Sequence, residues 1–179
     1  MKNKLTLVLV GLMTVLSFGF FSCKKETNVT QNTGAYNYYA LVNQSQWTYN
    51  NQTGEYFKSI DLSNLPNDFI FYLDGVVMYV TTYTQSGSNL DIDPLNAMNG
   101  NGTLFNGYYY YFQAHEDQDG PYVTIYAKPS TTGAPAPSSN LYFSIVLLQA
   151  QDMGQLSNST KNDFEQLKKV INIKTIPAN

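Results

Sequence analysis

Short apolar or alternating runs, separated by clusters of Gly, Pro, Asn, Asp and Ser, occupy most of the chain between residues 36 and 149. Such a pattern is typical of β-strands joined by turns. The strands are expected at residues 36–42, 46–49, 56–62, 76–83, 108–115, 122–128 and 141–149. A further apolar run at 69–73 fits either a buried strand or a short helix. The pattern predicts a mainly β fold, a single antiparallel β-sandwich of the immunoglobulin-like or jelly-roll-like kind.

Turn residues between these runs predict two β-hairpins. The sequence Asn-Asn-Gln-Thr-Gly at 50–54 separates one pair of runs, and residues 116–121, with Asp119-Gly120 near the tip, separate another. Both contain residues that tight turns favour. Residues 85–106 are rich in Gly, Ser and Asn, and we expect them to form a long loop. Loops of that length in compact domains are either functional or disordered.

The hydrophobic spacing changes near the C-terminus. Phe164, Leu167 and Ile171 recur at helical spacing. Ser159 or Thr160 can act as the N-cap, with Asp163 three or four residues later at the capping-box position. Acidic residues come early in this segment and lysines come late, as the helix dipole favours. The pattern predicts one short C-terminal α-helix near 160–170 that packs against the sandwich.

Cys23, the only cysteine, stands at the junction between an apolar leader and a polar segment. The leader begins with Lys2 and Lys4, continues with mostly apolar residues, and ends at the small residue Ser22. These are the parts of a secretory signal. The apolar stretch is a little short for a membrane-spanning helix, which needs roughly 20 residues. The ending Phe-Phe-Ser-Cys resembles the lipobox of bacterial lipoproteins, of the loose kind common in the Bacteroidetes.

The lipobox resemblance implies a domain organisation and a location. Residues 1–22 would be a signal peptide, 23–35 a lipidated flexible tether, and 36–179 the β-sandwich domain. Cys23 would carry a diacylglycerol group and an acyl chain such as palmitate, which meets the requirement of two or more chains for stable membrane attachment. The protein would then lie on the outer membrane, facing either the periplasm or the cell surface. The alternative is that Cys23 is an ordinary buried residue within an uncleaved membrane anchor.

Composition excludes several classes of partner. Removal of residues 1–22 takes away two of the ten basic residues and none of the thirteen acids, which changes the net charge from −3 to −5. An acidic chain without arginine is a poor partner for nucleic acid or anionic lipid, which require clustered Lys and Arg. With Cys23 acylated, no thiol remains for a disulfide or for catalysis.

Catalytic and metal sites receive little support from the sequence. A catalytic triad would have to use His115, the only histidine, and the chain has no Gly-x-Ser-x-Gly motif. Zinc requires clustered Cys and His ligands. Two Asp pairs resemble fragments of calcium loops and would form a site only if they meet in space, namely Asp91 with Asp93 and Asp117 with Asp119. We expect no enzymatic activity, no cofactor and no metal.

The aromatic run at 108–112 is the most distinctive candidate for a binding surface. Strand geometry places Tyr108, Tyr110 and Phe112 on one side and Tyr109 and Tyr111 on the other. One set is expected to fill the core while the other can line the exterior. Together with Trp47, the tyrosines at 108–111 are therefore candidate binding residues for a glycan or a protein, since aromatics are enriched at interfaces. The alternative is that loops or the helix cover the second side.

Features along the domain together resemble a group of small uncharacterised Bacteroidetes lipoproteins. The matching elements are Trp47, the strand at 74–80, the aromatic strand from Tyr108, the strands at 123–125 and 143–147, and the helix that begins at Asp163-Phe164. The group has no agreed activity. The resemblance implies a membrane-anchored, non-catalytic structural or envelope-assembly domain. The alternative is a surface module that binds a glycan or an envelope protein through exposed Tyr and Trp.

Overall fold

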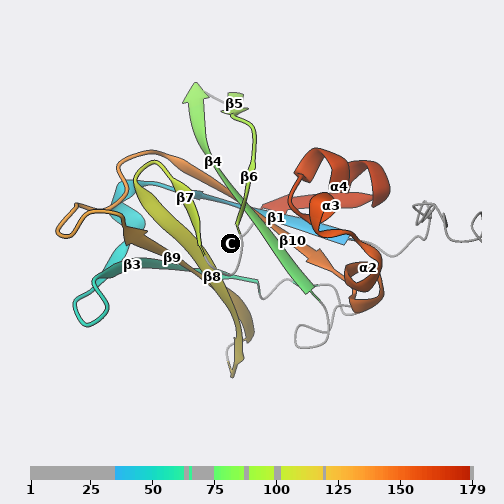
Figure 1. Ribbon diagram of the computed structural model, residues 1–179, viewed down its shortest axis with the longest axis horizontal. Helices are drawn as coiled ribbons and strands as arrows, with labels where there is room; N and C mark the ends of the chain where they lie inside the picture. The colour runs from blue at the N-terminus through green and yellow to red at the C-terminus, as the bar shows by residue number, and fades with distance from the viewer. Residues whose placement is uncertain are drawn as a thin grey trace, which may run out of the picture.

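The computed structural model describes residues 35–62, 65, 75–86, 89–98, 102–118 and 120–177. The expected signal peptide at 1–22, Cys23, the tether up to residue 34, the apolar run at 69–73, and Asp119 lie outside the described residues. The described part is mainly β, with two sheets and a few short helices (Figure 1).

The first sheet is built around a fully buried central strand. Its strands lie in the order β11 (Ile173–Pro177), β1 (Ala35–Val42), β10 (Leu141–Leu148), β4 (Gly75–Ser86) and β5 (Asn89–Ile92), and β6 (Asn96–Met98) also pairs with β4. All eight residues of β10 are buried, which explains its almost continuous apolar sequence. The pairs are antiparallel except for β1 and β11, which are parallel.

The second sheet contains both predicted hairpins. Its strands lie in the order β2 (Thr48–Asn50), β3 (Glu55–Asp61), β9 (Gly120–Pro129), β8 (Tyr108–Asp117) and β7 (Thr103–Phe105), and all pairs are antiparallel. Residues 51–54 form the turn between β2 and β3, where Gly54 has a positive φ of 72°. A short 3-10 helix, η1 (Gln44–Gln46), precedes β2.

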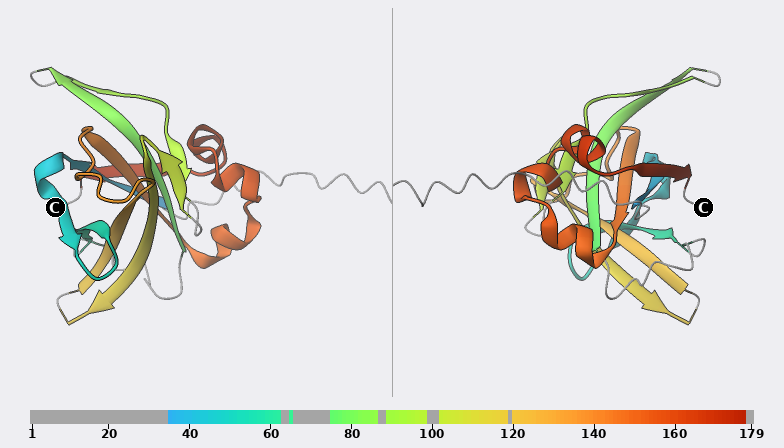
Figure 2. Two further views of the ribbon diagram at one scale, coloured as in Figure 1. Left: turned by 60° about the vertical axis from the view of Figure 1, so that its left-hand side comes forward. Right: turned by 90° about the vertical axis from the view of Figure 1, so that its right-hand side faces the viewer.

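The two sheets share one hydrophobic core. Tyr38, Met78 and Phe143 of the first sheet belong to the same buried cluster as Tyr110 and Ile125 of the second. The chain crosses from one sheet to the other between β1 and β2, β3 and β4, β6 and β7, and β9 and β10. The result is a sandwich-like arrangement of two sheets (Figures 1 and 2).

Three short helices cover the side of the first sheet that faces away from the second sheet (Figure 2). They are α2 (Ala150–Gln155), α3 (Asn158–Lys161) and α4 (Phe164–Val170). Leu167 and Ile171 pack with Tyr79 and Val146 in a second buried cluster. The Tyr79 hydroxyl also donates a 2.7 Å hydrogen bond to the carbonyl of Lys161. None of the helices in the described ranges has the length and apolar character needed to cross a membrane.

The C-terminal region differs from the single helix predicted at 160–170. The backbone turns at residues 162–163, so that two helices form, each with its own N-cap. Ser157 accepts a hydrogen bond from the Thr160 amide at 3.1 Å, and Asp163 accepts one from the Gln166 amide at 3.1 Å. Asp163 is therefore the N-cap of α4, and the prediction of Ser159 or Thr160 as its cap was wrong. Strand β11 was not predicted.

Two further predictions also require correction. The long loop predicted at 85–106 contains β5, β6 and β7. Asn106 and Gly107, with φ values of 47° and 81°, form the turn between β7 and β8. Asn-Gly is a strong hairpin signal because both of its residues tolerate positive φ. The strand predicted at 46–49 begins only at Thr48, so Trp47 precedes it.

Candidate functional site

Three of the candidate binding aromatics lie inside the protein. Trp47, Tyr108 and Tyr110 are 8%, 9% and 0% exposed. The Tyr110 ring lies 6.2 Å from Trp47 and 6.0 Å from Phe143, measured between ring centroids. Tyr108 and Tyr110 occupy the inward side of β8, and Trp47 packs against that side in the shared core. The expectation that these three residues form part of an exposed surface was therefore wrong.

The alternation predicted for the aromatic strand is present, and its outward set is Tyr109 and Tyr111. Tyr109 is 42% exposed, and Tyr111 is half-buried. Strand register and side-chain contacts sort their neighbours on β8, β9 and β3 into four rows. We call these rows the open face: Tyr109–Lys128–Glu55, Tyr111–Tyr126–Phe57, Gln113–Thr124–Ser59 and His115–Tyr122–Asp61. Helices α2, α3 and α4 lie on the other sheet, so none of the three covers this face (Figures 1 and 2).

Aromatic rings on the open face stack across neighbouring strands. Tyr111 and Tyr126 have ring centroids 4.8 Å apart and planes within 9° of parallel. Phe57 is directly opposite Tyr126 on β3, so three aromatic residues form one continuous row. The His115 ring stacks on Tyr122 at 5.1 Å. Stacking of this kind stabilises neighbouring strands and holds the rings in fixed positions.

Hydrogen-bonding groups lie beside these rings. The Tyr111 hydroxyl donates to Oε2 of Glu55 at 2.7 Å, and Nζ of Lys128 lies 4.0 Å from Oε1 of the same carboxylate. Burial, followed by the hydrogen bond to the negatively charged Glu55, raises the pKa of Tyr111 above its ordinary value. The Tyr126 hydroxyl donates to Oε1 of Gln113 at 3.3 Å. The open face thus alternates aromatic and polar rows.

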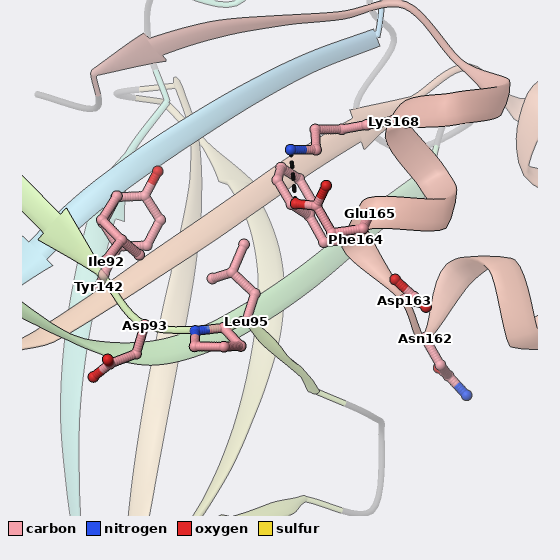
Figure 3. A pocket seen from close by; sticks show the side chains of 10 residues that line it. Ile92, Asp93, Leu95, Tyr142, Asn162, Asp163, Phe164, Glu165 and Lys168 are labelled. Carbon is pink, nitrogen blue, oxygen red and sulfur yellow. Dashed lines mark ion pairs between the residues drawn. The ribbon is translucent and has the colours of Figure 1, made fainter.

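A second candidate site is a hollow of about 720 Å³ over the first sheet. It lies between residues 92–95, which connect β5 to β6, and the start of α4. Figure 3 shows Tyr142 and Phe164 on opposite sides, with Leu95 between them. The Tyr142 ring is stacked on Tyr39, with centroids 5.6 Å apart and planes within 8° of parallel. Part of the hollow is therefore lined by rings and aliphatic groups.

Charged groups border this hollow. Lys168 forms an ion pair of 2.7 Å with Glu165, and its Nζ also lies 5.1 Å from the centre of the Phe164 ring (Figure 3). Asp163 caps α4, and Asp93 accepts a hydrogen bond from the Thr82 hydroxyl. Three carboxylates thus accompany one ammonium group among the lining residues.

Of the residues that resemble calcium-loop fragments, Asp91 and Asp93 do not meet Asp117 in the described structure. Asp91 lies in β5 and Asp93 follows it, whereas Asp117 ends β8. The β4–β5 and β8–β9 hairpins point to opposite ends of the molecule (Figures 1 and 2). Asp119 lies outside the described residues. Within the ranges that the structure describes, no group of three or more His, Cys, Asp or Glu side chains is placed to hold a metal ion.

The hollow could not be inferred from sequence motifs, because its residues come from three separate segments, at 92–95, 142 and 162–168. The only local signal was the capping position of Asp163. Comparison of the chain with protein-family models, with curated proteins and with solved structures finds no match. The features that bear on function are therefore the chemistry of the open face and of the hollow, and the sequence around Cys23.

Proposed function

We propose that the protein is a non-catalytic bacterial lipoprotein of the outer membrane, anchored through acylated Cys23, and that its open face binds a glycan. The proposed architecture is an antiparallel β-sandwich of the immunoglobulin-like or jelly-roll-like kind, in which β11 adds one parallel pairing at an edge. The main support for the binding role is the continuous row Tyr111–Tyr126–Phe57, placed next to the polar row Gln113–Thr124–Ser59.

The chemistry of sugars matches this alternation. A sugar ring presents C–H groups that pack against aromatic side chains, and hydroxyl groups that need hydrogen-bonding partners. Tyrosine supplies both an apolar ring and a polar tip. The exposed residues Gln113 and Ser59 add an amide and a hydroxyl group next to the rings, and buried Thr124 holds the Ser59 hydroxyl through a 3.1 Å hydrogen bond. An extended glycan lying across β8, β9 and β3 would meet both kinds of contact.

The charge of the open face favours a neutral glycan. Its four rows contain the carboxylates of Glu55 and Asp61 and the ammonium group of Lys128, which lies close to Glu55. An acidic polysaccharide would meet this negative charge without an arginine to bind its carboxylates, because the chain contains none. A neutral glycan avoids this repulsion.

A glycan array probed with the full-length lipidated protein in detergent tests this function. We expect retention of neutral glycans, and weaker retention after Tyr109→Ala, which removes an exposed ring of the open face. Tyr49→Ala is the matched control, because Tyr49 is similarly exposed, at 47%, and packs on Tyr56 away from the four rows. Failure to retain any neutral glycan, or equal losses in the two variants, would contradict the proposal.

The second candidate function is envelope assembly through an edge strand. β5 forms an edge of the first sheet, and Figure 1 shows the β4–β5 hairpin projecting from the body. Leu90 and Ile92 on this strand are 36% and 38% exposed. Edge strands with exposed apolar side chains suit pairing with a strand of another protein. Co-purification of an envelope protein that is lost after Leu90→Lys would support this role.

A further inference from the structure

We propose that the hollow beside α4 is a binding site for a small organic cation, meaning an ammonium group on a compact apolar body. This proposal concerns the side of the molecule opposite to the open face and does not depend on glycan binding. The volume of about 720 Å³ falls within the range of small-molecule sites, roughly 300–1,000 Å³.

The two rings that line the hollow are held in place from behind. Tyr142 stacks on Tyr39, with ring centroids 5.6 Å apart. Phe164 makes an edge contact with Tyr79, with ring centroids 5.2 Å apart. Rings that are already fixed lose little conformational freedom when a ligand binds. The hollow therefore offers a preformed aromatic surface.

The chain's own Lys168 shows that this surface accepts an ammonium group. Its Nζ lies 5.1 Å from the Phe164 ring centre and 2.7 Å from Oε1 of Glu165. A cation within about 6 Å of an aromatic ring is attracted by the negative charge of the ring face. Lys168 and Glu165 are both well exposed, so this pair can separate when another cation enters. A ligand ammonium group would make the same two kinds of contact.

The charge and the apolar lining define the rest of the ligand. Asp93, Asp163 and Glu165 outnumber Lys168, so the surroundings are negative and repel anions. Ile92 and Leu95 supply aliphatic surface to the same hollow. This combination suits methyl or methylene groups attached to a positively charged nitrogen. Quaternary and primary ammonium compounds both meet the description.

Two-dimensional NMR of the full-length lipidated protein in a nonionic detergent tests the proposal. The probes are choline and its uncharged isostere 3,3-dimethylbutan-1-ol, which share shape and differ in charge. We expect choline to cause saturable shifts of the amide signals of Ile92, Asp93, Leu95 and residues 162–168, with much weaker effects from the alcohol. Equal responses to the two probes, no response to choline, or saturable shifts confined to other regions would overturn the proposal.

Three substitutions separate cation recognition from general apolar binding. Phe164→Leu keeps apolar volume and removes the ring, and it should weaken choline binding by about two- to fivefold. Asp163→Asn retains a good N-cap residue and removes one charge, so it should weaken binding without loss of α4. Lys168→Met removes the internal cation, and it should strengthen choline binding. Weaker choline binding in folded Lys168→Met protein would contradict the proposal.

Discussion

Ser144 on β10 donates its hydroxyl to Oδ1 of Asn37 on β1 at 2.7 Å, in a contact between residues 107 positions apart. The two residues are 0% and 2% exposed, and the bond lies on the side of the first sheet that the helices face. A buried acceptor that loses its partner retains the desolvation penalty without the compensating bond. This contact therefore adds a buried side-chain bond to the backbone pairing of β1 with β10.

Replacing Ser144 by Ala should lower the free energy of unfolding by about 1–3 kcal/mol. A loss of this size is smaller than the stability of a typical domain, about 5–15 kcal/mol, so the variant should still fold. Urea denaturation monitored by Trp47 fluorescence measures the change. Ser138→Ala is the matched control, because Ser138 is exposed in the loop before β10 and should tolerate the same replacement. Equal midpoints for the Ser144 and Ser138 variants would show that the bond contributes no stability.

The spacing of apolar residues predicted correctly those strands whose sequence has a clear two-residue period or a continuous apolar run. The two-residue period predicted the strand at 108–115 and the alternation of its side chains between two sides. It did not show which of the two sides faces the other sheet. The turn at Asn106-Gly107 was readable from its residue types, but the surrounding Gly and Asn residues favoured a loop prediction. Strand β11 has only Ile173 and Ile176 as large apolar residues, and it forms through parallel pairing with β1, a contact distant in sequence.

In the candidate binding surfaces, too, some features follow from the local sequence and others from pairing between distant strands. The outward position of Tyr109 and Tyr111 was one of the two arrangements that alternation allowed. Their partners Tyr126, Phe57 and Glu55 depend on the pairing of β8 and β3 with β9, and short-range patterns do not specify this pairing. Burial of Trp47 depends on the packing of one sheet against the other, which is also a long-range feature. Long-range register, rather than residue type, thus determines which side chains are available to a ligand.

Two buried tyrosines are expected to respond oppositely to removal of the hydroxyl group. Tyr79 donates to the Lys161 carbonyl, whereas the Tyr110 hydroxyl is buried with no hydrogen-bond partner among the described residues. Tyr79→Phe should therefore lower the free energy of unfolding by about 1 kcal/mol, and Tyr110→Phe should raise it by about the same amount. Parallel urea titrations measure both changes. Destabilisation of similar size in the two variants would contradict this explanation.

Stability should decline at alkaline pH. Burial raises the pKa of Tyr79, Tyr110 and Tyr142 above the ordinary value of 10.0. The folded state therefore retains these protons at a pH where the unfolded state releases them. The stabilisation is fully present below about pH 10 and is lost as pH rises further, by at most about 1.4 kcal/mol per pH unit for each such tyrosine.

Urea unfolding measured at about pH 8 and about pH 11 tests this sign. The wild-type protein should be less stable at the higher pH, and Tyr110→Phe should reduce the difference because one titrating group is gone. Ser138→Ala is the control, since Ser138 is exposed and replacing it removes no titrating group in this pH range. If stability fell equally with pH in the Tyr110 variant and the wild type, the loss of stability at alkaline pH would come from groups other than Tyr110.

Contact between Gly75 and Met153 should make the start of β4 intolerant of any side chain. A Cβ atom added to Gly75 would lie 2.2 Å from Cγ of Met153 in α2. Gly75→Ala should therefore lower the free energy of unfolding by about 1–3 kcal/mol, because the side chain of Met153 must move. Adding Met153→Ala should remove part of this penalty, which a double-mutant cycle would detect as non-additivity.

Gly154→Ala provides a control with the opposite sign. Gly154 is the next residue of α2, and a Cβ atom there would meet no other atom within 4 Å. Alanine in an exposed helix should stabilise the protein by up to about 1 kcal/mol relative to glycine. Thermal unfolding of the variants distinguishes the two effects. If Gly75→Ala stabilised the protein instead, the contact with Met153 would not restrict residue 75. That result would show that β4 and α2 move apart at little cost.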